Sequence, residues 1–176
     1  MASRWYKKAK RSPAPTWAWG EMTGERTARK VVWHTSESDP GSIHGVVQWV
    51  QQQGSQYTLV WDPTTGEVIQ LLPADVGARS MMNDGWFPTN RYGDICIQIC
   101  VVGRAAKNPL TKGKPMKGRR KLLKWMDKWG VPRKVLPQGR RSRRMWRRSG
   151  HTTHNAAPGN DHRDPGKVDW GWLLRP

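Results

Sequence analysis

The sequence predicts a single α/β domain in which helices flank a β-sheet. Three observations support this fold class. Residues 94–102 alternate with the period of a β-strand, residues 42–53 carry apolar side chains at helical spacing, and residues 57–72 contain two short apolar runs separated by a turn. At 176 residues the chain is long enough to bury one hydrophobic core. We therefore expect one domain and not two.

The chain begins with a basic segment, rich in Pro and Trp, that shows no clear period. We interpret residues 1–27 as a basic N-terminal arm and residues 28–176 as the folded domain. Within that domain, residues 30–34 form a short apolar run that ends on His34 and is followed by a polar loop with Pro and Gly. His34 thus lies at the C-terminal end of a predicted strand, where α/β folds tend to place their sites.

A helix and a hairpin are expected next. Ser42 can cap the helix, which runs to about Gln53 and ends at Gly54. One face of this helix is apolar and consists of Ile43, Val46, Val47 and Val50. Residues 57–61 and 67–72 flank a turn with Pro and Gly, which predicts a β-hairpin with a longer loop.

The clearest strand in the sequence covers residues 94–102. Its alternation separates a core face from a face that could line a groove. The core face consists of Ile95, Ile97, Ile99 and Val101, and the opposite face of Cys96, Gln98 and Cys100. Four residues along a strand separate the two cysteines by roughly 13 Å, so they cannot form a disulfide with each other. Reduced thiols fit a cytosolic origin.

The formal net charge is +18, from 31 Lys and Arg against 13 Asp and Glu. The cations are densest in residues 104–148, where Asp127 is the only acid and a helix over residues 116–129 places its lysines outside. Such an excess predicts an anionic polymer as partner, although a merely solvated face is the alternative. Charge alone does not distinguish nucleic acid from an acidic cell wall or a lipid surface.

No membrane span or secretion signal is expected. The sequence has no run of eighteen apolar residues, and no hydrophobic stretch follows its basic N-terminus. We therefore expect synthesis in the cytoplasm without a signal peptide.

A cluster of polar residues near the C-terminus is the strongest chemical signal. Residues 150–166 contain three of the five histidines and two carboxylates, together with Pro-Gly turns. A solvated polar loop is one interpretation, and a metal site is the other. With His34, this cluster would supply two imidazoles and one carboxylate through His154 and Asp164. Three protein ligands leave a fourth position open, as in a catalytic zinc site that supports hydrolysis.

Several motifs together resemble a known family. These are the first-strand histidine with a helix behind it, the hairpin Tyr-x-Leu-Val followed by Gly-Glu-Val-Ile-Gln, the Ile-Gln-Ile strand, and the closing His-x3-Pro-Gly-Asn-x-His-x-Asp-Pro-Gly. They resemble the zinc-dependent N-acetylmuramoyl-L-alanine amidases of the amidase-2 and peptidoglycan recognition protein-like fold. The resemblance covers about residues 28–172 and is closest to the catalytic domains of phage endolysins against actinobacteria.

The resemblance implies a central mixed β-sheet flanked by helices and a zinc ion as cofactor. It implies hydrolysis of the amide bond between N-acetylmuramic acid and L-alanine in peptidoglycan, for host cell lysis. The expected partners are bacterial peptidoglycan and an anionic cell-wall polymer, with nucleic acid not favoured. We expect a monomer that is made in the host cytoplasm and acts on the cell wall.

The resemblance also assigns residues. The metal ligands would be His34, His154 and Asp164. His162 would donate to the amide oxygen and is also the rival of Asp164 as third ligand. Tyr57 resembles a tyrosine placed beside the catalytic water.

Two further histidines receive lesser roles. We expect His151 to support a ligand from behind or to lie at the surface, and His44 to be structural, as part of the predicted helix.

The sequence departs from the family at Cys100, where many relatives carry a catalytic glutamate. With Tyr57, this thiol would help orient the water, but a thiol of pKa about 8.5 is a poor acid–base catalyst at neutral pH. Glu37 and Asp161 are the nearest carboxylates that could replace the glutamate.

Two other functions therefore stay open. One is a catalytically impaired peptidoglycan-binding module of the same fold. The other is a basic nucleic-acid-binding protein that uses residues 140–148 on phosphates and some of its 12 tryptophans for stacking.

Overall fold

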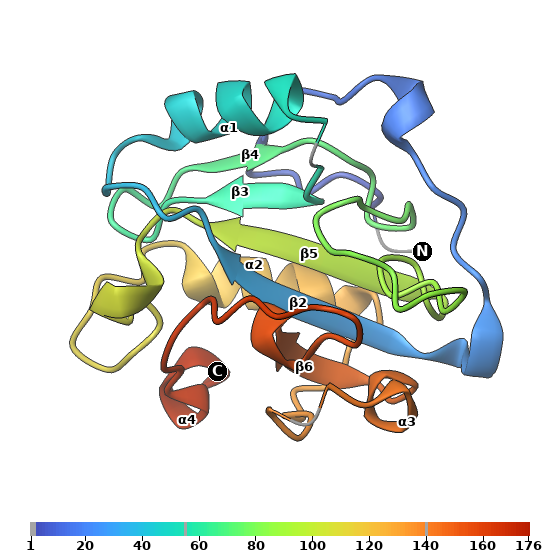
Figure 1. Ribbon diagram of the computed structural model, residues 1–176. Coiled ribbons are helices and arrows are strands. Elements are labelled where there is room, and N and C mark those ends of the chain that lie inside the picture. Colours follow the sequence, from blue (N-terminus) through green and yellow to red (C-terminus); the bar gives the residue numbers. More distant parts are fainter. Residues whose placement is uncertain (1–2, 55, 140) are drawn as a thin grey trace.

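A six-stranded mixed β-sheet forms the centre of the computed structural model, which describes residues 3–54, 56–139 and 141–176 (Figure 1). The strand order is β1-β4-β3-β5-β2-β6. The strands are β1 (Lys10–Arg11), β2 (Arg29–Thr35), β3 (Leu59–Trp61), β4 (Val68–Gln70), β5 (Ile95–Val101) and β6 (Gly150–Thr153). The sequence prediction of an α/β domain with a central mixed sheet is confirmed.

The centre of the sheet is parallel. Strand β2 lies between β5 and β6 and is parallel to both, and β5 is also parallel to β3. Strands β3 and β4 form the expected hairpin and are antiparallel. Because β2, β3 and β5 are parallel, their C-terminal ends lie side by side at one end of the strands. His34 lies at this C-terminal edge of the sheet.

Two helices cover opposite faces of the sheet. Helix α1 (Ile43–Gln52) packs its apolar face on β3, β4 and Cys100 of β5. Helix α2 (Arg119–Lys128) packs on the other face, against Trp33, Ile97 and Ile99. The predicted two-faced character of β5 is therefore confirmed, with its isoleucines facing α2 and Cys100 facing α1. Figure 1 shows α2 behind the sheet.

The two predicted helices are both present, with different ends from those expected. Helix α2 begins at Arg119 and not near residue 116, because Gly118 has a φ of 82° and cannot continue a right-handed helix backwards. The side chain of Ser42 does not cap α1; its hydroxyl donates to the carbonyl of Asp39 instead.

The remaining helices are short. They are η1 (Thr16–Ala18), η2 (Glu25–Thr27), η3 (Ala105–Lys107), α3 (Arg143–Trp146), η4 (His154–Ala156) and α4 (Trp170–Leu173). Within the described ranges, no helix has the length and apolar character needed to cross a membrane.

Two strands were not expected from the sequence. Part of the N-terminal arm forms β1, which pairs with β4 at one edge of the sheet. The C-terminal cluster begins with β6, which extends the sheet at its other edge by pairing with β2. Strand β6 positions the cluster, because it brings the chain alongside β2 just before His154.

Candidate metal centre

His34 lies near the C-terminal end of β2 with a fully buried side chain. Neither ring nitrogen has a hydrogen-bond partner. Burial lowers the pKa of His34 to about 4, so the imidazole is neutral at neutral pH and keeps a lone pair. A buried nitrogen without a partner is costly, and a bound cation would remove that cost.

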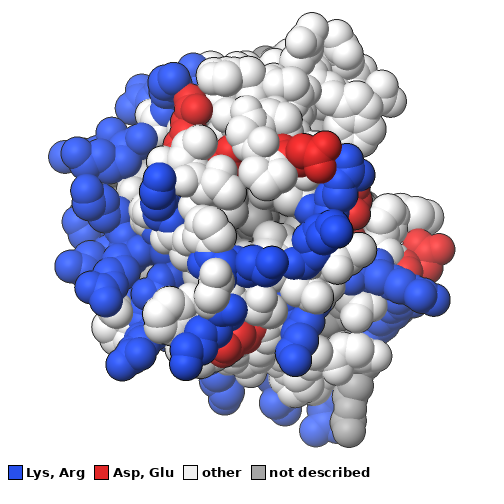
Figure 2. All heavy atoms as spheres, turned by 90° about the vertical axis from the view of Figure 1, so that its left-hand side faces the viewer, with Lys and Arg blue, Asp and Glu red and all other residues white. Residues whose placement is uncertain are grey.

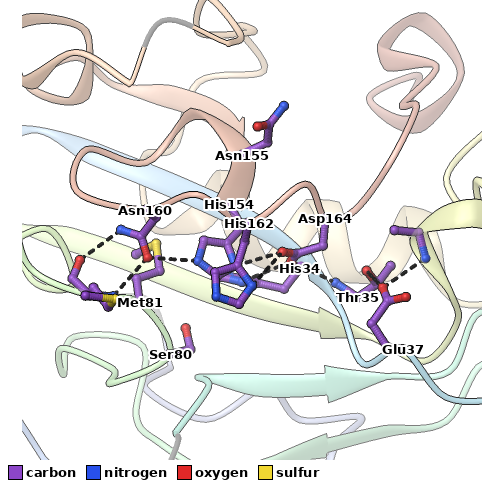
Figure 3. Close-up of polar contacts among 12 residues, drawn as sticks. His34, Thr35, Glu37, Ser80, Met81, His154, Asn155, Asn160, His162 and Asp164 are labelled. Atoms are coloured by element: carbon purple, nitrogen blue, oxygen red, sulfur yellow. Dashed lines mark hydrogen bonds and ion pairs between the residues drawn. The ribbon is translucent and has the colours of Figure 1, made fainter.

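His154 and Asp164 face His34 from the C-terminal loop (Figure 3). The Nδ1 atom of His154 lies 2.9 Å from one carboxylate oxygen of Asp164, and Nδ1 of His34 lies 3.6 Å from the other. The backbone N–H of Thr35 donates to Asp164 at 3.3 Å, which attaches the loop to the end of β2. The three side chains thus converge on one point at the edge of the sheet.

Asn160 holds the other side of the His154 ring. Its Oδ1 accepts from the backbone N–H of Met82, and its Nδ2 donates to the carbonyls of Met82 and Pro158, all at 2.9 Å. Since Oδ1 is the acceptor, Nε2 of His154 must donate to it, at 3.0 Å. In the neutral ring, Nδ1 therefore carries the lone pair and faces Asp164.

The charge of Asp164 is retained despite its burial. Burial alone would raise the pKa of this carboxyl, but the neighbouring imidazoles of His154 and His34 outweigh that effect and hold the pKa below its usual range. Because Nδ1 of His154 and the Asp164 carboxylate face each other at 2.9 Å, a cation between them would stabilise the arrangement.

These three residues form a candidate metal site. One ligand atom from each of them can be chosen so that all lie within 4.8 Å of one another. Zinc bonds of about 2.0–2.1 Å in a tetrahedral site separate ligand atoms by roughly 3.3 Å. Small side-chain rotations would bring the three ligand atoms to this spacing. The unpartnered nitrogens of His34 and the donor types therefore fit zinc.

The other histidines lie outside the set. His162 stacks on His154 with ring centroids 4.5 Å apart, but its side chain is 59% exposed and its Nδ1 is 3.8 Å from Asp164. The expected supporting or surface role of His151 is wrong. It is buried on the opposite face of the sheet, where Trp33 donates to its Nδ1. His44 is exposed on α1, 3.4 Å from Glu67.

A cleft of about 670 Å³ opens beside the candidate metal site. Its walls come from the loop after β2, from α1 and from the histidine loop. The lining includes Glu37, Trp49, Tyr57, Ser80, Cys100, His154 and His162. Sequence reasoning placed Cys100 on a groove-facing side, and the structure agrees.

Tyr57 and Cys100 lie together next to His34. The rings of Tyr57 and His34 meet edge to face with centroids 5.1 Å apart, and Cys100 is the β5 residue in register with His34. Burial raises the pKa of both Tyr57 and Cys100 above their usual values, and the nearby charge of Asp164 raises both further. The hydrogen bond from Tyr57 lowers the pKa of Cys100, but burial outweighs it. Both groups are therefore neutral at neutral pH and can only take part in hydrogen bonds there.

Of the two replacement carboxylates named from the sequence, only Glu37 lines the cleft. One of its oxygens accepts from the Thr35 hydroxyl at 2.6 Å and from the backbone N–H of Ala105 at 2.9 Å. Glu37 also has a φ of 55°, an uncommon conformation for a residue with a side chain. Asp161 is exposed and does not line the cleft.

Sequence reasoning missed Asn160 and Thr35. Asn160 belongs to the Pro-Gly-Asn motif inside the C-terminal cluster, but its role depends on Met82, 78 residues earlier in the chain. Thr35 acts through its backbone, which leaves no signal in residue type.

Comparison with known proteins gives matches in structure only. No family model and no curated protein matches the sequence. Among solved structures, an AmpD derivative has 16% identity and a TM-score of 0.61, covering 98% of this chain and 96% of that one. The Staphylococcus aureus hydrolase AmiA has 14% identity and a TM-score of 0.63, covering 97% and 81%.

A third solved structure is the endolysin N-acetylmuramoyl-L-alanine amidase LysCS from Clostridium intestinale. It has 11% identity and a TM-score of 0.56, covering 97% of this chain and 95% of that one. The chain thus has the fold of the amidase-2 class, as the sequence predicted, and it carries a candidate His-His-Asp metal site at the C-terminal edge of the sheet.

Proposed function

We propose that this protein is a zinc-dependent amidase that cleaves the bond between N-acetylmuramic acid and L-alanine in peptidoglycan. One observation carries the proposal. In a fold shared with amidases, the buried and unpartnered nitrogens of His34 face His154 and Asp164 at the side of an open cleft. In this proposal, the three residues hold the zinc ion.

When bound, zinc would act as a Lewis acid toward the scissile carbonyl and lower the pKa of water to about 7. The protein's own residues supply the other requirements. His162 lines the cleft beside His154 with an exposed ring, so its N–H can donate to the carbonyl oxygen as negative charge develops there. We propose this role for His162 and the third ligand position for Asp164.

Tyr57 is proposed to orient the attacking water. Its hydroxyl remains protonated at neutral pH because burial raises its pKa. It lies against both His34 and Cys100, so it can donate one hydrogen bond to water on the side of the cleft facing the metal ligands. Cys100 is a weak partner in this arrangement, since a neutral thiol neither removes a proton nor accepts strongly.

The size of the cleft also supports a sugar–peptide substrate. At about 670 Å³ it is within the range for small-molecule sites, and it is open at one side, as a polymer requires. Trp49 on α1 forms an apolar wall and is 55% exposed, while Ser36, Ser38 and Ser42 form a polar wall. We propose that the protein acts as an endolysin, made in a bacterial host and acting on its wall.

Lysis of purified peptidoglycan tests the proposal. The protein should reduce the turbidity of a wall suspension, lose this activity after chelation, and regain it with zinc. His34→Ala should fold and remain inactive at every zinc concentration, whereas His44→Ala, which changes an exposed histidine on α1, should lyse like the wild type. Undiminished lysis by His34→Ala would refute the proposal.

A second function is favoured by Cys100. A peptidoglycan-binding module without hydrolysis would keep the cleft and lack the base that a glutamate at this position would supply, a loss worth about 10²–10⁴ in rate. Wild type, Cys100→Ala and Cys100→Glu should be compared on the same walls. An inactive wild type that binds walls, together with activity in Cys100→Glu, would favour the binding module; an active wild type would exclude it.

A further inference from the structure

The densest basic run in the sequence is largely used for internal contacts. Arg143 contacts Asp84 at 2.6 Å, Arg141 donates to Asn155, and the guanidinium of Arg147 lies over the rings of Phe87 and Tyr92. Residues 141–148 therefore attach α3 to the domain and leave few cations available for a partner. The cations that could bind a partner must therefore lie elsewhere on the protein.

Among the residues that the structure describes, exposed cations without an ion pair are concentrated on the outer face of α2. Four cations project from this helix, and within the described part of the chain none of them belongs to an ion pair: Arg120, Lys121, Lys124 and Lys128. The one acid on the helix, Asp127, is paired with Arg133 at 2.7 Å. Because Lys124 and Lys128 lie one turn apart, their charges repeat about every 6 Å along the helix.

Two shallow hollows extend this charge to either side. One, of about 510 Å³, is lined by Lys114, Lys117 and Trp172 beside the start of α2. The other, of about 380 Å³, is lined by Lys7 of the N-terminal arm beside the middle and end of α2. Lys121 lines both hollows, so the surface is continuous. We call it the α2 basic face, made of Lys7, Lys114, Lys117, Arg120, Lys121, Lys124 and Lys128.

The α2 basic face and the cleft lie on different faces of the sheet. Helix α2 packs against the side of β5 that carries the isoleucines, whereas the cleft is lined by α1 and by Cys100 on the other side. Figure 2 shows cations gathered along the side of the molecule on which α2 lies, behind the sheet of Figure 1. A polymer bound to the α2 basic face would leave the cleft open.

The chemistry of this face indicates a polyanion and not a small anion. Its cations are exposed lysines for the most part, which act as flexible point charges and recognise charge density more than geometry. Open hollows without an enclosed anion pocket do not select one small molecule. A repeating chain of anions would meet several of these charges at once.

The aromatic residues argue against single-stranded nucleic acid. Such ligands stack their bases on exposed rings. Among the described residues, the exposed tryptophans are Trp17, Trp49 and Trp86, and none belongs to this face. Trp125 is buried against the core, and the guanidinium of Arg119 lies over the ring of Trp172.

We propose that the α2 basic face binds an anionic, phosphate-bearing polymer of the bacterial cell wall and holds the cleft close to its substrate. The choice of a wall polymer rests on the proposed function, since the wall is where an amidase of this kind acts. The charge pattern itself stands without it.

The test compares two variants that lose the same charge. Lys121→Gln/Lys124→Gln/Lys128→Gln changes the α2 basic face, and Arg26→Gln/Arg144→Gln/Arg148→Gln changes exposed cations in and beside η2 and α3. Glutamine keeps the helix propensity of α2. Binding to purified walls is measured across a salt series, before and after the phosphate polymers are removed from the walls by mild acid.

We expect the α2 variant to bind intact walls at least tenfold more weakly at low salt. The magnitude of the negative slope of log affinity against log salt should decrease by about three, one for each lost contact with a dense polyanion. The control variant should bind like the wild type, and stripped walls should not distinguish the three proteins. All three should cleave a soluble muropeptide equally, which separates this inference from the proposed function.

Three results would overturn the inference. Equal loss in both variants would show that net charge matters and not this face. The same loss on stripped walls would exclude the phosphate polymer. Binding to duplex DNA that is tighter than binding to walls at the same salt, and that the α2 variant weakens to the same extent, would identify nucleic acid as the partner. If no protein cleaves the muropeptide but the wall-binding pattern holds, the proposed function fails and the binding surface remains.

Discussion

Asn160 determines which nitrogen of His154 faces Asp164. The amide of Asn160 is fixed by the backbone of Met82, so its oxygen accepts from Nε2 of His154, and Nδ1 is left 2.9 Å from the Asp164 carboxylate. Two acceptors at this distance require a shared cation, either a proton or a metal ion. The contact between Asn160 and His154 therefore makes the geometry of the candidate metal centre depend on the backbone of residues 80–83.

Replacing Asn160 should weaken metal binding without abolishing the fold. Asn160→Ala frees the His154 ring to rotate and to change its tautomer, and outer partners of this kind contribute about 10- to 100-fold in metal affinity. Zinc affinity can be measured by competition with a chromogenic chelator. Asn155→Ala is the control, since Asn155 points away from the site in Figure 3 and contacts Arg141. An unchanged affinity in Asn160→Ala would contradict the role given to it.

The metal-free protein should lose stability as the pH falls from about 6.5 to 4. Burial lowers the pKa of His151 to about 4, so the unfolded chain binds a proton in this range while the folded chain does not. Stability from this residue is complete above pH 6.5 and decreases toward pH 4 by about 3 kcal/mol. His34 should add a similar loss, since burial lowers its pKa to about 4 as well.

Urea unfolding at several pH values measures this loss. His151→Leu should reduce the difference in unfolding free energy between pH 7 and pH 4, even if the variant is less stable at pH 7 because Trp33 loses its acceptor. His44→Leu, which replaces an exposed histidine, is the matched control for this substitution. A pH dependence that is identical in His151→Leu and the wild type would disprove the linkage.

Gly159 should be intolerant of a side chain. It has a φ of 73°, and an added Cβ would lie 2.7 Å from the Cα of Asp84. Gly159→Ala should cost about 2 kcal/mol or more of unfolding free energy and should also lower zinc affinity, since the loop carries His154 and Asp164. Gly41 has a φ of 83° but open space around it, so Gly41→Ala should cost only the backbone strain of about 1 kcal/mol.

Thermal or urea unfolding and zinc titration of the two glycine variants give the comparison. Equal costs in Gly159→Ala and Gly41→Ala would show that the contact with Asp84 is not restrictive.

Tyr57→Phe should lower turnover and leave zinc affinity unchanged. The substitution removes one hydroxyl beside His34 and keeps the ring that packs against it. We expect kcat on a soluble muropeptide to fall by about 10- to 100-fold with little change in KM, because the lost hydrogen bond orients water and does not bind substrate. Tyr6→Phe, whose ring packs with Trp125 on the α2 side, should behave as the wild type. A change in KM alone would reassign Tyr57 to substrate binding.

The elements predicted from the sequence are those with a strong local period. Helices α1 and α2, the β3–β4 hairpin and the two faces of β5 all follow from spacing within one segment. Strand β6 was missed because it is four residues long, polar in part, and stabilised by pairing with β2; Trp33 and His151, which contact each other, are 118 residues apart. A strand that depends on so distant a partner carries little local signal.

The same division holds for the site. The residue types and the Pro-Gly turns indicated His34, His154 and Asp164, and the structure brings them together. The contacts that set their geometry come from Asn160 with Met82 and from the backbone of Thr35, which only the folded chain defines. His151 was misplaced because a strand, not a loop, carries it and turns its ring to the opposite face of the sheet.

Identifying the amino termini that form in peptidoglycan tests the central claim most directly. Zinc-loaded protein is incubated with purified peptidoglycan, and newly formed amino termini are labelled and identified. We predict that L-alanine termini appear with the wild type and are absent with His34→Ala. Release of other termini or of reducing sugars instead, or no release by a wild-type protein shown to contain one zinc ion per chain, would contradict it.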